Sequence, residues 1–259
     1  MQAVRIVPFN QTIKLGEGLQ VTYYISGHII GAALLVIESV EGTLVMSGDV
    51  STSPLRTVPS IKLPRIQADA LVLESTYGGR LHANRAAEEK RLVQSLRRVI
   101  ERGGSVLIPA FALGRAQEVL QILLAYREEI LAPVYVDGMV RSVCDAYMRF
   151  TEFIPYQTLK RAKEEHLFFR NNIHPITGMQ HRSNVATSHE PKIIVASSGM
   201  MTGGASQYYA RFIAPEERNA IFLTGYQDEE SPGRFLQNLR IQREGGEIPA
   251  VFFGKTEVK

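Results

Sequence analysis

Two short polar motifs follow apolar, strand-like runs and carry side chains of the kind that bind metal ions. One is a Ser-Gly-His sequence that ends at His28, and the other is a Ser-Gly-Asp sequence that ends at Asp49. An imidazole nitrogen and a carboxylate oxygen suit zinc or a similar divalent ion if the two strands are neighbours. The structural alternatives are a histidine satisfied by a backbone carbonyl and an aspartate that caps a turn. Because zinc usually takes at least three protein donors, these two residues alone do not complete a metal site.

A third acidic residue, Glu74, ends the apolar run that begins at Leu71 and precedes a Ser-Thr-Tyr-Gly sequence. A carboxylate in this position could orient or polarise a catalytic imidazole, as carboxylates around metal sites do. The alternative is an N-cap or an ion-pair partner for Arg80, and spacing alone does not separate these roles.

Two strand-to-helix turns have the composition of anion sites. The first runs from Pro109 to Glu118 and places Arg115 in the first turn of a helix, and the second is the Ser/Gly-rich segment 197–204. Free backbone N–H groups at a helix N-terminus attract anions, and the forked guanidinium of Arg115 suits a phosphate. Most Ser/Gly turns only connect secondary-structure elements, so one such turn is weak evidence for an anion site. The evidence is stronger here because both turns follow strands.

The elements that must position these motifs are five apolar runs without alternation, typical of parallel strands buried on both faces. They cover residues 71–74, 106–110, 134–138, 193–196 and 221–224. Ligands of such sheets collect at the carboxyl ends of the strands, where the polar motifs lie. The first 70 residues or so favour β-structure, with strands at 19–25, 32–38 and 43–46 and an exposed loop at 53–64. Helices are predicted at 84–102, 114–130, 140–150 and 206–213, and a flexible loop at 179–190.

The composition is that of a globular protein with 45% hydrophobic and 21% charged residues in 259. The single cysteine, Cys144, excludes an intrachain disulfide and a cysteine metal cluster and fits a reducing, cytoplasmic location. No apolar run has the length of a signal peptide core or a membrane span. The net charge is +3, and the basic residues between Arg80 and Arg102 alternate with glutamates, which favours a solvated helix face over a nucleic-acid footprint.

Taken together and in order, six motifs resemble the β-CASP branch of the metallo-β-lactamase superfamily, RNA-processing nucleases akin to the cleavage and polyadenylation specificity factor endonuclease. They are the segments 26–33, 47–49, 74–78, 109–118, 196–200 and 225–227. The resemblance implies an α/β protein with a partial metallo-β-lactamase αββα domain at 1–78. It also implies a β-CASP domain with a mainly parallel sheet at 79–240, and a segment at 241–259 that returns toward the first domain.

The resemblance also implies roles for individual residues. His28 and Asp49 match metal ligands, with Asp49 bridging two zinc ions, and Glu74 matches the acidic residue that opens the β-CASP motifs, so that Asp49 and Glu74 become the catalytic candidates. In such enzymes a zinc-activated hydroxide attacks a phosphodiester phosphorus. The residues that the resemblance places against RNA are Arg115, Ser197, Ser198, Gly199, Met200, Gly225 and Gln227.

The departures from the family pattern shape the functional hypothesis. No two histidines stand one residue apart, so the His-x-His-x-Asp-His motif is absent, and the sequence stops at Lys259, before the segment that carries the family's last histidines. We therefore expect a fragment truncated at both ends and inactive alone, with a second copy or a complementing chain covering the incomplete domain. Two alternatives stay open: a non-catalytic RNA-binding or scaffold module, and an α/β domain that binds a small molecule through the same loops.

Overall fold

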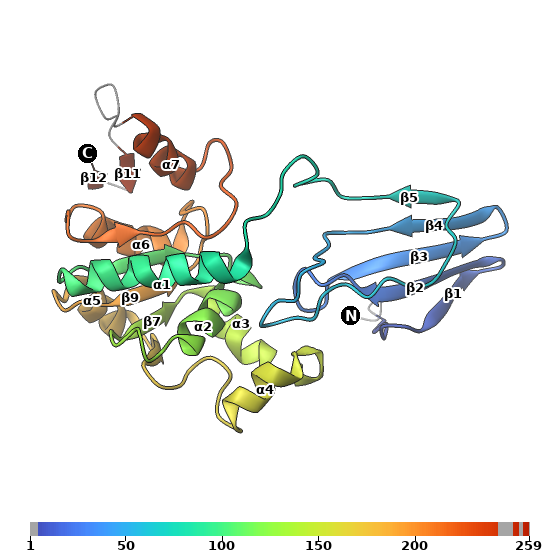
Figure 1. Cartoon of the computed structure of the whole chain (residues 1–259), viewed down its shortest axis with the longest axis horizontal. Coiled ribbons are helices and arrows are strands. Elements are labelled where there is room, and N and C mark those ends of the chain that lie inside the picture. The colour runs from blue at the N-terminus through green and yellow to red at the C-terminus, as the bar shows by residue number, and fades with distance from the viewer. Residues whose placement is uncertain (1–4, 243–250, 254–255, 259) are drawn as a thin grey trace. The chain divides into compact units, whose positions relative to one another are not determined.

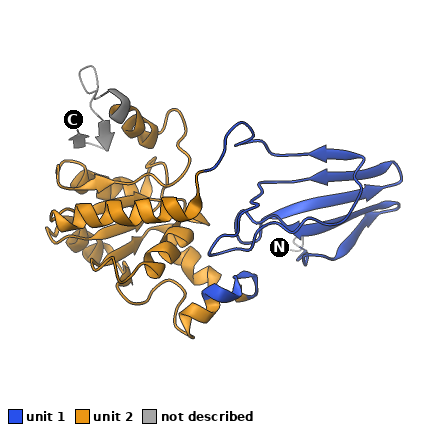
Figure 2. Cartoon of the chain, viewed as in Figure 1, with its two compact units in different colours: residues 1–82, 152–158 blue, residues 83–151, 159–259 orange. Residues whose placement is uncertain are grey.

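The computed structural model describes residues 5–242, 251–253 and 256–258, and it shows an α/β protein (Figure 1). The chain divides into two compact units (Figure 2). Unit 1 comprises residues 1–82 and 152–158, and unit 2 comprises residues 83–151 and 159–259. Within the described residues, no helix has both the length and the apolar composition needed to span a bilayer.

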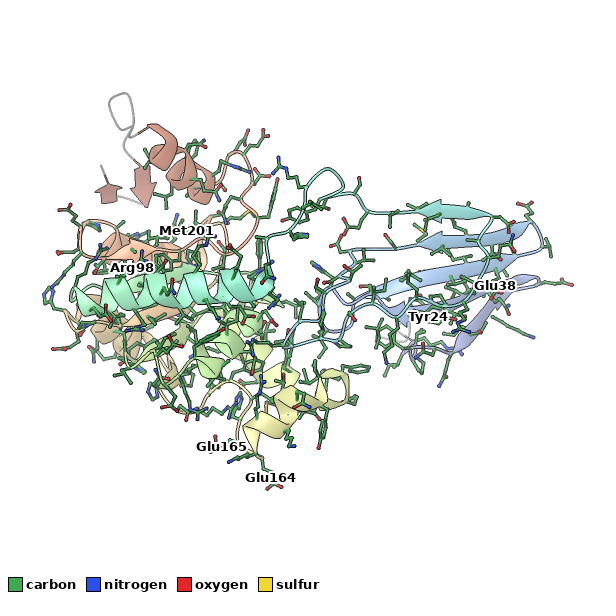
Figure 3. The ribbon with its side chains drawn as sticks, viewed as in Figure 1. Tyr24, Glu38, Arg98, Glu164, Glu165 and Met201 are labelled. Carbon is green, nitrogen blue, oxygen red and sulfur yellow. The ribbon has the colours of Figure 1, made fainter. Side chains whose placement is uncertain are left out.

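Unit 1 is built on a five-stranded sheet in sequential order. Its strands are β1 (Thr12–Gly16), β2 (Leu19–Ile25), β3 (Ala33–Ser39), β4 (Gly42–Met46) and β5 (Ala70–Val72). Neighbours pair antiparallel as far as β4, and β5 pairs parallel with β4. Leu34 and Val36, two residues apart on β3, point to the same face and form a small core with Val45. Tyr24 packs against this core from β2 (Figure 3). Ile61 packs against it from the segment between β4 and β5.

Unit 2 is built on a second five-stranded sheet, which is parallel throughout and has the order β10-β6-β9-β7-β8. Its strands are β6 (Val106–Pro109), β7 (Val134–Asp137), β8 (Ile173–Pro175), β9 (Ile193–Ala196) and β10 (Ala220–Ile221). Every residue of β6 and β9 is buried. The mainly parallel sheet expected from the apolar runs is therefore confirmed.

Helices cover both faces of this sheet. The helices of the described chain are α1 (Arg85–Glu101), α2 (Arg115–Ala125), α3 (Met139–Tyr147), α4 (Tyr156–Ala162), α5 (Met179–Thr187), α6 (Gly204–Ile213) and α7 (Pro232–Gln242), with a 3-10 turn at Thr151–Phe153. The 3-10 turn and α4 lie at the boundary between the two units, since residues 152–158 belong to unit 1. On one face, Leu107 and Ile194 pack with Val185 of α5 and Tyr209 of α6. The alternate strand residues point to the other face, where α1 contacts β6 and α2 contacts β9.

Some element boundaries agree with the sequence prediction and others do not. Helix α1 begins after Asn84, whose side chain accepts a hydrogen bond from the N–H of Ala87, a common N-cap arrangement. Helix α2 is shorter than predicted, because it ends at Ala125 rather than near residue 130. Strand β1 had no clear signal in the sequence, since its segment is mostly exposed and ends in glycine.

Two expectations were wrong. The apolar run at Leu71 is not a strand of the parallel sheet: it forms β5 at the edge of the unit 1 sheet, where Leu71 is 59% exposed. A continuous apolar run indicates that a strand can be buried on both faces. Whether helices or other strands cover those faces depends on segments far away in the sequence. The predicted flexible loop at 179–190 is largely the helix α5, because Val185 and Ala186 are buried against the core of unit 2.

The predicted return segment, 241–259, lies mostly outside the described residues, which omit 243–250, 254–255 and 259. Of its described part, β11 (Val251–Phe253) pairs antiparallel with β12 (Thr256–Val258). The return toward the first domain stays a prediction.

Candidate functional site

Strand direction in unit 1 brings three polar motifs to the same end of the sheet. Strands β2 and β4 both run antiparallel to β3, and β5 runs parallel to β4, so the carboxyl ends of β2, β4 and β5 lie on the same side. His28 follows β2, Asp49 follows β4 and Glu74 follows β5. Strands that flank a common neighbour lie roughly 10 Å apart, so the loops beyond them must bend inward for these side chains to meet.

The loops after β2 and β4 do bend toward one another. Gly27 and Val50 form an isolated antiparallel bridge, and the N–H of Ser51 donates to the carbonyl of Ser26 at 3.0 Å. As a result, Nε2 of His28 lies 3.7 Å from Oδ2 of Asp49. The structure thus brings together the two residues that the sequence suggested as metal ligands.

A glycine before each of these residues makes the bend possible. Gly27 has a φ of +80°, and a Cβ there would lie 2.5 Å from the backbone nitrogen of Ile61. Gly48 has a φ of +56°, and its Cβ would lie 2.9 Å from the carbonyl oxygen of Ala33. Positive φ is costly for residues with a side chain, and the crowding removes the remaining room. Both Ser-Gly-X motifs are therefore steric requirements of the site.

Glu74 joins the same edge through backbone contacts. Its N–H donates to Oγ of Ser47 at 3.0 Å, and its carboxylate accepts from the N–H groups of Thr76 at 3.0 Å and Val50 at 3.4 Å. The hydrogen bonds from Thr76, then the bond from Val50 and the nearby imidazole of His28, lower the pKa of the Glu74 carboxyl. Glu74 therefore stays ionised and holds the Asp49 loop in place, and the described residues show no ion pair between it and Arg80.

The donor chemistry of this edge fits a divalent ion only in part. The side chains of His28 and Asp49 are 46% and 67% exposed, so a metal ion from solvent can reach both. Among the residues that the structure describes, however, no group of three or more His, Cys, Asp or Glu side chains converges on one point. The pair supplies two ligands of the right kind, and the described residues do not complete the site.

In unit 2, three strand-end loops meet around Phe111. A Cβ at Gly199, in the loop after β9, would lie 2.7 Å from the backbone nitrogen of Phe111. A Cβ at Gly225, beyond β10, would lie 3.1 Å from the Phe111 ring. These glycines let the backbones of the loops after β6, β9 and β10 approach closely, as ligand sites at the carboxyl ends of parallel strands require.

The buried side chain of Gln227 connects the loops after β9 and β10 by hydrogen bonds. It is buried, and its Nε2 donates to the carbonyls of Gly199 at 3.1 Å and Gly225 at 3.2 Å. Arg234 donates to the Gln227 carbonyl at 2.6 Å, and the N–H of Gly233 donates to the Met200 carbonyl. Gln227 therefore shapes the loop surface, and its side chain does not present a polar group to solvent.

Other predicted contact residues are more accessible. Arg115 is exposed as the first residue of α2, and its side chain makes no hydrogen bond or ion pair within the described part of the chain. Ser197 and Ser198 are half-buried. Their hydroxyls accept hydrogen bonds from the backbone N–H groups of Met139 and Thr202, respectively, at 3.1 Å. The structure brings Ser197, Gly199, Gly225 and Gln227 into one loop cluster.

A buried ionic network beside Ser197 was missed by the sequence reasoning. Asp137, at the end of β7, is fully buried and binds the guanidinium of Arg182 at 2.6 and 2.9 Å and the hydroxyl of Tyr209 at 2.9 Å. Burial by itself would raise the pKa of Asp137, but the hydrogen bonds from Arg182, Gly138 and Tyr209 outweigh it and lower the pKa. An aspartate that ends an apolar strand was the only local signal, since Arg182 lies in the segment taken for a loop.

Comparisons with known proteins agree with these features. A family model described as the Beta-Casp domain matches residues 116–236. The chain is 34% identical to "Transcription termination factor FttA" of Pyrococcus abyssi over 96% of this chain and 39% of that protein. It is 35% identical to "RNase aCSPSF2" of Saccharolobus solfataricus over 85% of this chain and 43% of that protein. It is 31% identical to "Endoribonuclease YSH1" of Mycosarcoma maydis over 91% of this chain and 27% of that protein.

The residues that match the Beta-Casp domain, 116–236, include four of the five strands of the parallel sheet, β7 to β10. The chain belongs to the β-CASP family of the metallo-β-lactamase superfamily, as its motifs suggested. It spans less than half the length of these relatives.

Proposed function

We propose that this chain is part of an RNA-processing hydrolase that cleaves phosphodiester bonds with the help of zinc. Relatives named as an RNase and an endoribonuclease support the reaction class. The observation that carries the proposal is the distance of 3.7 Å between Nε2 of His28 and Oδ2 of Asp49 on an exposed loop edge. Both side chains are open to solvent, so a metal ion could reach the pair.

Each of the three unit 1 residues receives a role under this proposal. His28 and Asp49 supply a nitrogen and an oxygen ligand to a zinc site that needs further donors, and a bound ion neutralises charge on the phosphodiester. Glu74 holds the Asp49 loop through the N–H of Val50 and keeps negative charge beside His28. Such a neighbour favours a fixed imidazole orientation.

RNA contact belongs to the strand-end loops of unit 2. Arg115 offers an exposed guanidinium at a helix N-terminus, where a phosphate is favoured by both charge and backbone N–H groups. Ser197, Ser198, Gly199 and Met200 form the loop that we expect to face RNA, and Gly225 and the buried Gln227 hold this loop in shape around the buried Gly199. We expect Gln227 to act on RNA binding through loop geometry.

The test is filter binding of a short single-stranded RNA, repeated at raised salt. Because phosphate contacts release counterions, affinity should fall steeply as salt rises. Arg115→Gln should weaken binding about tenfold, as for the loss of one charge-assisted contact. Arg98→Gln, a loss of the same charge from the exposed last turn of α1, is the matched control (Figure 3). Absence of RNA binding would reject the proposal and favour the small-molecule alternative.

A second candidate is a non-catalytic RNA-binding or scaffold module. It is favoured by the lack of a three-ligand cluster among the residues described. Because the hydrolase reading expects no turnover from this chain alone, the neighbouring coding sequence separates the two. An in-frame His-x-His-x-Asp-His segment, and zinc-dependent cleavage by a protein that includes it, abolished by Asp49→Asn, support the hydrolase. The lack of such a segment, with RNA binding and no cleavage, supports the module. For either candidate we propose a cytoplasmic location, consistent with the single buried thiol of Cys144.

A further inference from the structure

A cavity lined by both polar and apolar side chains lies at the amino ends of β6 and β9, at the end of the sheet opposite the strand-end loops. Ser105 and Lys192, each directly before one of these strands, form its floor, and α6 and the segment that follows form a wall. It encloses about 340 Å³. None of the motifs assigned above to metal or RNA lines it.

The lining carries more positive than negative charge. Lys192, Arg211 and Arg218 contribute three cationic groups, and among the described lining residues Glu216 is the one carboxylate, with its Oε2 3.8 Å from Nε of Arg218. His189 adds an imidazole whose Nδ1 lies 3.4 Å from the Arg218 guanidinium. An excess of cations in a partly enclosed space attracts anions more strongly than the same charges spread over a surface.

Lys192 is the most informative residue of the cavity. It is only 2% exposed, and its ammonium donates to the carbonyls of Ser188 at 2.5 Å and Glu190 at 2.9 Å. An ammonium has three donors, and among the described residues no carboxylate lies within 4.0 Å of this one. Desolvation lowers the pKa of Lys192 although Glu190 opposes this, and the nearby Arg218 lowers it further. A buried cation without a counter-ion is costly, and a bound anion would relieve that cost.

The cavity wall is held in a defined geometry. The Arg218 carbonyl accepts a hydrogen bond from Nε of Arg102 at 2.7 Å, and Oδ1 of Asn219 accepts one from the N–H of Ser105 at 2.7 Å. Nδ2 of Asn219 donates to the Ile213 carbonyl at 3.2 Å. A pre-ordered wall lowers the entropic cost of binding.

We propose that this cavity is an anion site that binds the phosphate group of a nucleotide, either free or at the end of an RNA strand. Arg211 and Arg218 bind phosphate oxygens at the mouth, and Lys192 supplies charge from the floor. The ring of Phe212, which also lines the cavity, offers a surface on which a base stacks. The volume suits a mononucleotide rather than a folded nucleic acid. This site is independent of the zinc ligands and of the strand-end loops.

The first experiment is calorimetric titration of the whole chain with adenosine monophosphate and, separately, with inorganic phosphate. We expect saturable binding of both, tighter for the nucleotide because of stacking. The double variant Arg211→Gln/Arg218→Gln should weaken binding at least about tenfold. Arg98→Gln, an exposed arginine in the same unit but outside the cavity, should leave it unchanged (Figure 3). Absence of saturable binding, or equal effects of the two variants, would overturn the proposal.

Lys192→Met tests the floor of the site, since methionine keeps an unbranched chain but removes the charge. We expect a folded protein by circular dichroism with weakened phosphate binding. If this variant does not fold, the arginine double variant, altered only at exposed positions, still decides the question.

Competition then separates the two sources of the phosphate. The competitors are a short RNA with a 5′-phosphate and the same RNA without it. If only the phosphorylated RNA displaces the nucleotide, the site recognises the end of an RNA strand. Displacement by neither RNA identifies a free nucleotide, and displacement of the nucleotide by both RNAs equally would contradict recognition of a terminal phosphate.

Discussion

The candidate metal ligands owe their positions to the residues just before them. Gly27 and Gly48 adopt positive φ angles that fit the chain between neighbouring backbones, so His28 and Asp49 reach a common point. The side-chain types of His28 and Asp49 alone made them candidate metal ligands. The glycines before them allow the backbone conformation that brings the two side chains close together.

A substitution at Gly27 tests this steric role. Gly27→Ala should lower the free energy of unfolding by about 2 kcal/mol or more, because both the positive φ and the contact with Ile61 penalise a Cβ. Urea denaturation measures the change. Gly79→Ala is the control, since nothing lies within 4 Å of a Cβ at Gly79. Equal stability of the two variants would mean that the loop can relax freely.

A second prediction at this scale concerns metal content. With only His28 and Asp49 converging among the residues that the structure describes, the chain should retain fewer than two equivalents of zinc after dialysis. Elemental analysis measures the zinc per chain. Two retained equivalents would refute the prediction, and zinc content unaffected by His28→Ala would remove His28 from the ligand set.

At the scale of elements, the Asp137 network links β7, α5 and α6 beside the Ser197 loop. Asp137 ends β7, Arg182 lies on α5 and Tyr209 lies on α6. The Met139 N–H, just beyond β7, donates to Oγ of Ser197. The network therefore fixes both the packing of two helices and the position of one proposed RNA-contacting loop.

Loss of the Asp137 charge should destabilise the protein strongly. Asp137→Asn leaves Arg182 without its carboxylate, and removing one partner of a buried pair costs about 3 kcal/mol or more. Denaturant unfolding at neutral pH measures this, with Asp145→Asn as a control because Asp145 is 65% exposed. A change as small as that of the control would show that the network contributes little.

The same network predicts an acid dependence of stability. Because the pKa of Asp137 is lowered in the folded state, its contribution is complete above the pKa of an unfolded aspartate and is lost as pH falls through the folded value. The stability of the native chain should therefore fall more steeply below about pH 4 than that of Asp137→Asn. Parallel acid profiles for the two proteins would contradict the lowered pKa.

At the scale of the whole molecule, the edge strand β5 offers a surface for association. It pairs only with β4 in the described part of the chain, and Leu71, Val72 and Leu73 are 59%, 53% and 60% exposed. Exposed apolar edge strands pair readily with other chains, so the expected covering by a second copy or a complementing chain has a physical basis here.

We therefore expect the chain to self-associate as its concentration rises. Light scattering should show larger species, and Leu71→Lys should reduce them because a charge on an edge strand opposes pairing. Leu81→Lys is the control, since Leu81 is fully exposed outside any strand. A monodisperse monomer at all concentrations would rule out this mode of association.

The sequence alone determined the features that depend on near neighbours along the chain. Buried parallel strands such as β6 and β9 were recognisable from continuous apolar runs, and α1 from its periodicity and from Asn84. The order of the strand-end motifs was also enough to suggest the family. These signals are local, because strand and helix periodicity and capping involve residues only a few positions apart.

Only the tertiary structure decided which of these features meet. It assigned the Leu71 run to the edge of another sheet, made a helix of the segment around Arg182, and buried Lys192 without a carboxylate partner among the described residues. It also joined His28 to Asp49 across an intervening strand. Each outcome depends on strand order and on contacts between residues far apart in the chain, and such contacts leave no periodic pattern in the sequence.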